Sequence, residues 1–262
     1  MFFKSFVLLA ILTSPLPNGE APAGKLGISY VQAQELGTRI WKNECGGKVE
    51  GLTSWNEGED FASLGIGHFL WYPSGRKQTF KETFPSVLEF MESCGVTLPD
   101  WLDPTGGCPW RNRKQFLQNI DSRKMVELRE FLKETRALQA IYIAKRLEEA
   151  LPKMTAKLEL TEKRRVEKHF NALARTPKGL YALIDYLNFK GEGTSTSEMY
   201  QGKGWGLLQV LQGIPENSIR PLDDFVKAAK ELLEERVRNA PTGKTERRWL
   251  KGWNARLNTY LQ

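Results

Sequence analysis

Apolar residues recur at helical spacing along most of this 262-residue chain, beginning close to its N-terminal end. Ser29 and Gln32 have the spacing of a capping box, in which two side chains satisfy free N–H groups at a helix start. The residues then predicted to face a core are Val31, Leu36 and Ile40. Gly46 and Gly47 are typical of a helix end. These signals predict a helix over about residues 29–45.

A segment of different character follows this helix. Between residues 51 and 68, short extended pieces flank a turn sequence at residues 56–60, Asn-Glu-Gly-Glu-Asp, which is typical of a β-hairpin. Residues 73–120 then contain five prolines. They predict an inserted, loop-rich segment with short helices near residues 84–94 and 111–120.

The remainder of the chain has a helical pattern almost to its end. The predicted helices cover residues 122–150, 161–174, 177–190, 222–239 and 244–261. Thr176 and Pro177 fit the cap and the first position of the third of these. We therefore expect an α+β fold that is mostly helical, with a small β-hairpin near the N-terminus, in a single domain over residues 24–262.

The first 23 residues are typical of a signal peptide. One lysine, Lys4, precedes an apolar run over residues 5–13, and Ala21-Pro22-Ala23 matches the small-residue exit of a cleaved signal. The run is too short to span a bilayer, and no later segment reaches the roughly 18 apolar residues of a membrane helix. We expect a secreted or periplasmic protein without stable membrane insertion.

The chain carries 38 Lys and Arg against 31 Asp and Glu, a formal net charge of +7. A basic exported protein is attracted to anionic polymers such as cell-wall material or nucleic acid. Along the predicted helices, however, Lys and Arg alternate with Glu, as at residues 162–165 and 234–236, which is typical of solvated faces. We therefore expect a polysaccharide partner and no nucleic acid.

Three cysteines and two histidines limit the metal and disulfide chemistry of the chain. In an oxidising compartment, Cys94 and Cys108 are the local choice for a disulfide, which would leave Cys45 free. The sequence has no Cys-X-X-Cys motif, so we expect no metal site. The glycine-rich stretches at 190–193 and 202–206 lack the spacing of a phosphate-binding loop, and no cofactor is expected.

Glu44 is the first candidate for a chemical role. It ends the first predicted helix, one turn beyond Ile40 on the apolar stripe. Partial burial and the negative end of the helix dipole both raise the pKa of a carboxyl group, as a glycosidase acid requires. A glutamate before a glycine helix stop is usually only a surface residue, so this position alone is weak evidence.

The segments around Glu44 resemble the phage-type lysozymes. In that family a helix ending in the catalytic glutamate is followed by a hairpin and a Gly-Ile-Gly-His segment, here Ser63-Leu64-Gly65-Ile66-Gly67-His68. The segment Ala182–Gly191 is similar to the helix below their cleft, and residues 247–253 lie where they carry an Arg-rich closing helix. The nineteen residues from Glu44 to Ser63 make the hairpin longer than in those enzymes, and the 73–120 insertion has no counterpart.

The resemblance implies a lysozyme-like fold and a glycosidase that cuts β-1,4-linked cell-wall glycan. Glu44 would be the general acid. Glu57 would stabilise the oxocarbenium-like state or order a water that Ser63 holds, with Glu59 and Asp60 as alternatives to Glu57. The predicted substrate-binding residues are Trp55, His68, Asn188 and Trp205. Peptidoglycan is the expected substrate, ahead of chitosan or chitin, and the protein is expected to act as a monomer.

Hydrolysis and lytic transglycosylation both remain open from the sequence. So do two alternatives of other classes. One is a lysozyme-like protein that binds glycan without cutting it, and the other is a basic protein that interacts with nucleic acid or acts as an effector. Loss of activity on replacing Glu44 separates an enzyme from a binding protein.

Overall fold

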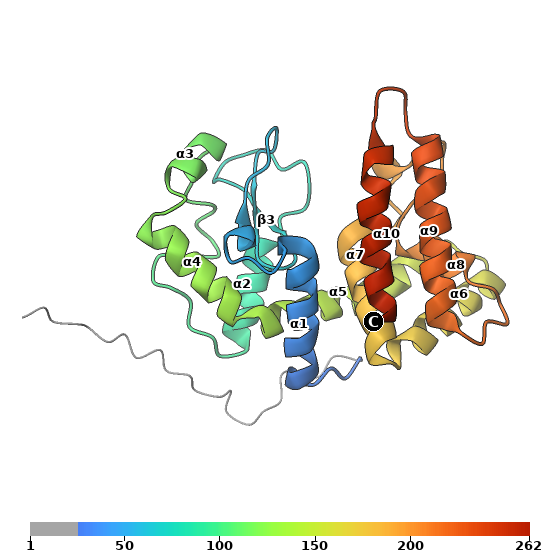
Figure 1. Cartoon of the computed structure of the whole chain (residues 1–262). Helices are drawn as coiled ribbons and strands as arrows, with labels where there is room; N and C mark the ends of the chain where they lie inside the picture. Colours follow the sequence, from blue (N-terminus) through green and yellow to red (C-terminus); the bar gives the residue numbers. More distant parts are fainter. Residues whose placement is uncertain (1–25) are drawn as a thin grey trace, which may run out of the picture.

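The computed structural model describes residues 26–262, and the predicted signal peptide at residues 1–23 lies outside them. The described chain has the predicted α+β character, mostly helical with one small antiparallel sheet near its start (Figure 1). Its α-helices are α1 (Tyr30–Cys45), α2 (Phe84–Ser93), α3 (Arg113–Gln118), α4 (Arg123–Glu134), α5 (Arg136–Thr155), α6 (Leu160–Ala174), α7 (Pro177–Lys190), α8 (Leu207–Gly213), α9 (Pro221–Asn239) and α10 (Leu250–Asn258). Short 3-10 helices are η1 (Glu50–Leu52), η2 (Thr196–Glu198), η3 (Glu246–Trp249) and η4 (Thr259–Leu261).

The sheet contains the predicted hairpin and one further strand. Its strands are β1 (Thr53–Ser54), β2 (Ala62–Leu64) and β3 (Phe69–Trp71), hydrogen-bonded in that order and all antiparallel to their neighbours. Ser63 sits at the centre, opposite Ser54 on one side and Leu70 on the other. The turn between β2 and β3 is the Gly-Ile-Gly-His segment.

Helix α5 is the central element of the fold. It contacts α1, α2, α4, α6 and α7, and eleven of its twenty residues are buried. Figure 1 shows the sheet and α1–α4 on one side of α5 and α6–α10 on the other. The end of α1, the β2–β3 turn and the end of α7 therefore come together near the middle of the molecule.

Most predicted helices are confirmed, with local differences that have physical causes. The capping box of Ser29 and Gln32 is present, and Gly46 ends α1 in a left-handed conformation. The prediction that Val31 faces the core is wrong, because it is 65% exposed. At about 100° per residue, nine residues turn Val31 to the face opposite the buried Ile40.

Two helical predictions needed tertiary information. The single helix predicted over 122–150 is two helices, which meet at Thr135, where the hydroxyl donates to the Phe131 carbonyl at 2.7 Å. The last predicted helix, over 244–261, is divided into η3, α10 and η4. Helix α8 was not predicted, because its seven residues are too few for a clear periodic pattern.

The predicted disulfide between Cys94 and Cys108 is wrong, since all three cysteines are free thiols. Cys94 caps the end of α2, where its N–H donates to the Phe90 carbonyl, whereas the Cys108 N–H donates to the Tyr72 carbonyl beside the sheet. Burial raises the pKa of the Cys108 thiol to about 12, so this thiol is unreactive. None of the helices within residues 26–262 is both long and apolar enough to cross a membrane.

Candidate active site

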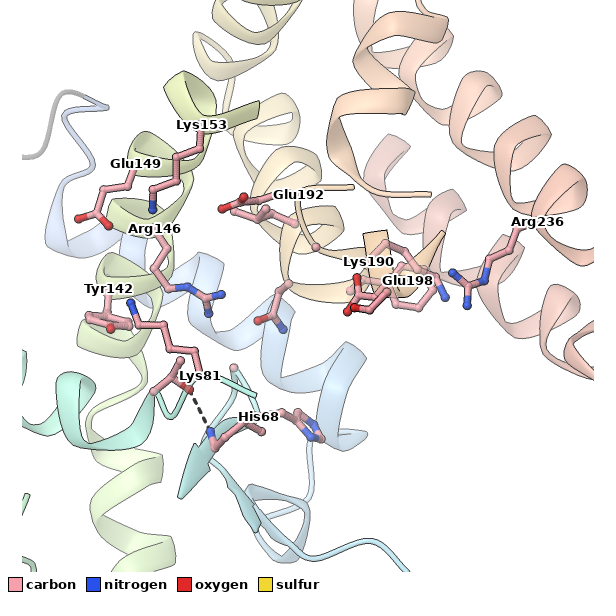
Figure 2. Close-up of a pocket in the computed structure, with 18 of the residues that line it drawn as sticks. His68, Lys81, Tyr142, Arg146, Glu149, Lys153, Lys190, Glu192, Glu198 and Arg236 are labelled. Atoms are coloured by element: carbon pink, nitrogen blue, oxygen red, sulfur yellow. Dashed lines mark hydrogen bonds between the residues drawn. The ribbon is translucent and has the colours of Figure 1, made fainter. Parts of the chain in front are cut away.

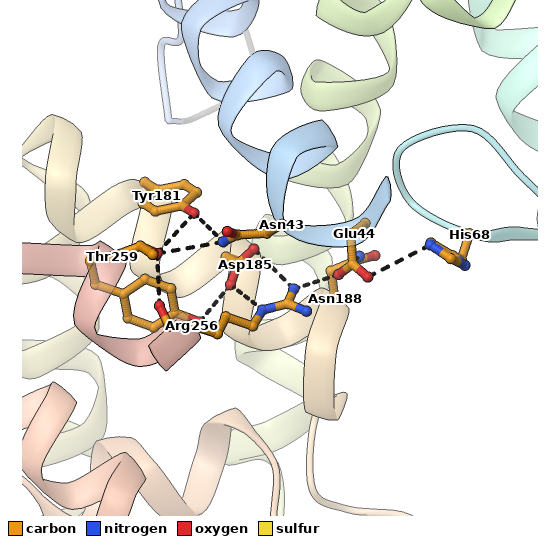
Figure 3. Close-up of polar contacts among 9 residues, drawn as sticks. Asn43, Glu44, His68, Tyr181, Asp185, Asn188, Arg256 and Thr259 are labelled. Carbon is orange, nitrogen blue, oxygen red and sulfur yellow. Dashed lines mark hydrogen bonds and ion pairs between the residues drawn. The ribbon is translucent and has the colours of Figure 1, made fainter. Parts of the chain in front are cut away.

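Glu44 is the penultimate residue of α1, and its side chain is 15% exposed. The helix ends at this point because Gly46 has a φ of +60°, a conformation that residues with a Cβ rarely adopt. The carboxylate is surrounded by side chains from α7, from α10 and from the β2–β3 turn (Figure 3). These three segments are far from Glu44 in sequence.

The two glycines of the Gly-Ile-Gly-His turn allow its close approach to the neighbouring side chains. Gly65 has a φ of +70°, and a Cβ there would lie 2.3 Å from Gln139 Oε1, which accepts the Ile66 N–H at 2.9 Å. A Cβ on Gly67 would lie 2.5 Å from the ring of Phe69. The tight turn directs His68 toward Glu44, with Nε2 at 3.7 Å from Oε2.

A buried ion cluster lies on the other side of Glu44. Arg256 of α10 donates to both carboxylate oxygens of Asp185, from Nε at 2.8 Å and from Nη2 at 3.0 Å. The same Nη2 also donates to Glu44 Oε1. Asp185, on α7, is fully buried and accepts a third hydrogen bond from Tyr260 at 2.6 Å. Arg256 thus bridges two carboxylates (Figure 3).

Asn188 completes the surroundings of Glu44 from the last turn of α7. Its side-chain amide donates to Glu44 Oε1 at 3.1 Å. Two turns earlier, Tyr181 accepts a hydrogen bond at 2.5 Å from Asn43, the residue before Glu44. The end of α1 is therefore attached to α7 by two adjacent side chains, which fixes where the Glu44 carboxylate lies.

The charge environment of Glu44 differs from the sequence prediction of a raised pKa, which is wrong. Burial raises the pKa of Glu44, but the positive charge of Arg256 and its hydrogen bond act in the opposite direction. His68 and Asn188 add to them, and the net effect holds the pKa below its ordinary value. The resting carboxyl group is therefore ionised near neutral pH.

A cleft of about 730 Å³ lies beside this cluster (Figure 2). His68 and Asn188, which both contact Glu44, are part of its lining. The wall is mostly polar and charged, with contributions from α5, the end of α7, the following loop and α9. Its size suits a few linked sugars, and its polar groups can hydrogen-bond hydroxyls.

The carboxylates predicted from the hairpin lie elsewhere. Glu57 is exposed on the β1–β2 turn, Glu59 accepts from the Asn56 side chain at 3.1 Å, and the 60% exposed Asp60 pairs with Arg76 at 3.8 Å. None of the three carboxylates is among the residues that line the cleft.

The remaining predicted site residues are buried. Ser63 is 5% exposed in β2. Trp55 packs edge-on against Phe116, and Trp205 packs against Tyr200. The structure therefore brings Glu44, His68 and Asn188 together, and it does not bring Ser63 or these tryptophans to the cleft lining.

Sequence reasoning missed Asp185 and Arg256. One signal for Asp185 was available, because it is an acidic residue between the apolar residues of α7 and so required a buried partner. No signal selected Arg256 from the many basic residues near the C-terminus. Among residues 26–262, no group of three His, Cys, Asp or Glu side chains is placed to hold a metal ion.

Comparison with known proteins does not assign this chain to a family. Neither a protein-family model nor a curated protein matches the sequence, and no solved structure matches the fold. The resemblance to phage-type lysozymes therefore stays a prediction from short motifs.

The buried position of Arg256 generates a stability prediction. Arg256→Met should lower the free energy of unfolding by about 3–5 kcal/mol, because it leaves the fully buried Asp185 without its counter-charge. Urea unfolding measures this difference. Arg238→Met, at an exposed position of α9, is the matched control and should change stability by no more than about 0.5 kcal/mol. Equal effects of the two substitutions would contradict a stabilising ion cluster.

Proposed function

We propose that the protein is an enzyme that cuts β-1,4-linked cell-wall glycan, with Glu44 as the general acid. One observation carries the proposal: a largely buried glutamate ends a helix beside a polar cleft, and two of its contacts, His68 and Asn188, line that cleft. A shielded carboxyl group within one side-chain contact of a sugar-sized cleft is close to where a glycosidic oxygen would be protonated. The resemblance of the surrounding motifs to phage-type lysozymes supports the same activity.

A general acid must carry a proton, so the low pKa of Glu44 fits this role only when bound substrate changes the contacts of the Glu44 carboxylate. Arg256 holds Asp185 through two nitrogens and Glu44 through only one, so it can release Glu44 and remain paired. A glycan in the cleft also removes water from the site. Both changes favour the neutral, proton-carrying form of Glu44.

The position of the hairpin carboxylates favours lytic transglycosylation over hydrolysis. Glu57, Glu59 and Asp60 are absent from the cleft lining. The glutamates that do line the cleft, Glu149, Glu192 and Glu198, are not among the groups that shift the pKa of Glu44, so we assign the reaction to Glu44 without a second carboxylate. It would give its proton to the leaving glycosidic oxygen as the bond to the anomeric carbon breaks. The ionised Glu44 would then take the proton of a hydroxyl on the same sugar, whose oxygen attacks the anomeric carbon and closes an internal ring.

Replacing Glu44 tests whether the protein is an enzyme. Glu44→Gln keeps the shape of the side chain but carries no acidic proton, so clearing of purified cell walls should slow by at least about 10²-fold. Turbidity of the wall suspension measures the rate. Glu35→Gln, on an exposed position of the same helix, is the control and should retain wild-type clearing. Glycan binding without clearing by the unmodified protein would instead support a non-catalytic binding protein.

The products separate the two forms of cleavage. With Glu44 acting alone, mass spectrometry should find fragments that have not gained a water molecule, and Glu57→Gln should clear walls at the wild-type rate. Fragments that contain one added water, together with a loss of about 10²-fold or more in Glu57→Gln, would indicate hydrolysis with Glu57 as the second group.

The pKa of Glu44 predicts the pH dependence of the reaction. Since kcat/KM reports ionisation in the free enzyme, it should fall about tenfold per pH unit as pH rises above the lowered pKa of Glu44. Asn188→Leu removes a hydrogen bond that lowers this pKa, so the fall should move to higher pH. Asn171→Leu, at an exposed site on α6, is the control. Superimposable pH profiles for the two variants would contradict the assignment of Glu44.

A further inference from the structure

Lys190 is a partly buried cation that packs against two aromatic rings and has no anionic partner within residues 26–262. It is the last residue of α7, two positions after Asn188, and its side chain lines the cleft. Its ammonium nitrogen lies 3.7 Å from the ring centroid of Trp253 and 4.1 Å from that of Phe189. Within residues 26–262, it forms neither a hydrogen bond nor an ion pair. A partly buried amine in this state has unused capacity to bind an anion.

Two further cations lie at the same end of the cleft. Arg236 of α9 and Lys244 both donate to the Tyr200 hydroxyl, at 3.0 and 3.1 Å. Glu246 already pairs with Arg236, with 2.9 Å between Nε and Oε2. Figure 2 shows Lys190, Glu198 and Arg236 close together on one side of the cleft.

The whole cleft has an excess of positive charge. Its charged lining residues are Lys81, Arg146, Lys153, Lys190, Arg236 and Lys244 against Glu149, Glu192 and Glu198. Six cations against three anions leave a formal excess of three positive charges. Such a wall attracts an anionic chain and repels a cationic one.

The lowered pKa of the Lys190 amine agrees with the lack of a full negative counter-charge next to it. Burial, together with the positive charge of Arg236, lowers the pKa of Lys190, Glu246 only partly offsets them, and the resulting value is about 7. An anion bound beside the amine would supply a counter-charge that Glu246 only partly provides.

We propose that Lys190, together with Arg236 and Lys244, binds an acidic substituent of the glycan, so that the substrate is an acidic glycan and not neutral chitin or cationic chitosan. This inference rests on the proposed function for its link to cleavage. Lys190 and Arg256 contact the same ring, that of Phe189, with 4.1 and 4.3 Å to its centroid. Arg256 in turn contacts Glu44, so the acidic group belongs to a sugar close to the bond that is cut.

The test compares two forms of one ligand. The first is a β-1,4-linked oligomer whose sugars carry lactyl carboxylates, and the second is the same oligomer with these groups converted to neutral amides. Binding is measured by calorimetry in the Glu44→Gln background, which prevents turnover, at a pH below 7 so that Lys190 is protonated. The acidic oligomer should bind on the order of tenfold to a hundredfold more tightly than the amide.

Lys190→Met then identifies the residue responsible. Methionine keeps the unbranched shape of lysine and can pack against the same two aromatic rings, and removing the unpaired charge breaks no ion pair, so the variant should remain folded. It should lose the preference for the acidic oligomer and bind the amide as before. Lys251→Met, at an exposed position of α10, is the control and should keep the preference.

Each outcome decides one of the two proposals. Equal binding of the two oligomers, or a preference that survives in Lys190→Met, would overturn the subsite. A Lys190-dependent preference without any wall cleavage by the unmodified protein would keep the subsite and overturn the proposed function. Cleavage without the preference would keep the function and overturn the subsite.

Discussion

The bridge that Arg256 forms between Asp185 and Glu44 is the interaction on which the site depends. It joins α10 to α7 and to the end of α1, and Glu44 and Arg256 are 212 positions apart in the sequence. Burying three charged groups costs desolvation free energy, which only good geometry and full hydrogen bonding offset. Here the guanidinium uses two nitrogens on Asp185, and Tyr260 supplies a third hydrogen bond to that carboxylate. The cluster therefore holds Glu44 in one place beside the cleft.

The same bridge determines the chemistry that Glu44 can perform. A glutamate next to a guanidinium is ionised at rest, and this differs from an acid kept protonated by burial alone. Release of Glu44 by Arg256 would convert it to a proton donor without breaking the pair between Arg256 and Asp185. Arg256 and Lys190 both contact the ring of Phe189, which connects the surroundings of Glu44 to the cationic end of the cleft.

Local sequence signals were sufficient to predict most helices, the hairpin and part of the candidate site. The capping residue Ser29 and the stop at Gly46 defined α1, and the two glycines around Ile66 marked the turn that directs His68 toward Glu44. Asn188 was found because its segment resembled a known helix. The order of these motifs along the chain was enough to predict Glu44, His68 and Asn188 as parts of one site.

The rest of the site depends on packing that the sequence does not encode locally. Asp185 and Arg256 are 71 positions apart, and only the packing of α10 on α9 and of η4 on α7 brings this arginine to Asp185. The hairpin carboxylates were misleading for a related reason. A turn of exposed acidic residues has the same composition whether it faces a cleft or solvent, and the orientation of the sheet decides between the two.

The most direct test of the account is a crystal structure of the Glu44→Gln variant with a cell-wall glycan oligomer bound. If Glu44 is the acid, a glycosidic oxygen should lie about 2.6–3.2 Å from the side chain at position 44, with the sugars along the cleft between His68 and Lys190. A glycan bound in the cleft with no glycosidic oxygen near position 44, or bound only at another surface, would contradict Glu44 as the acid.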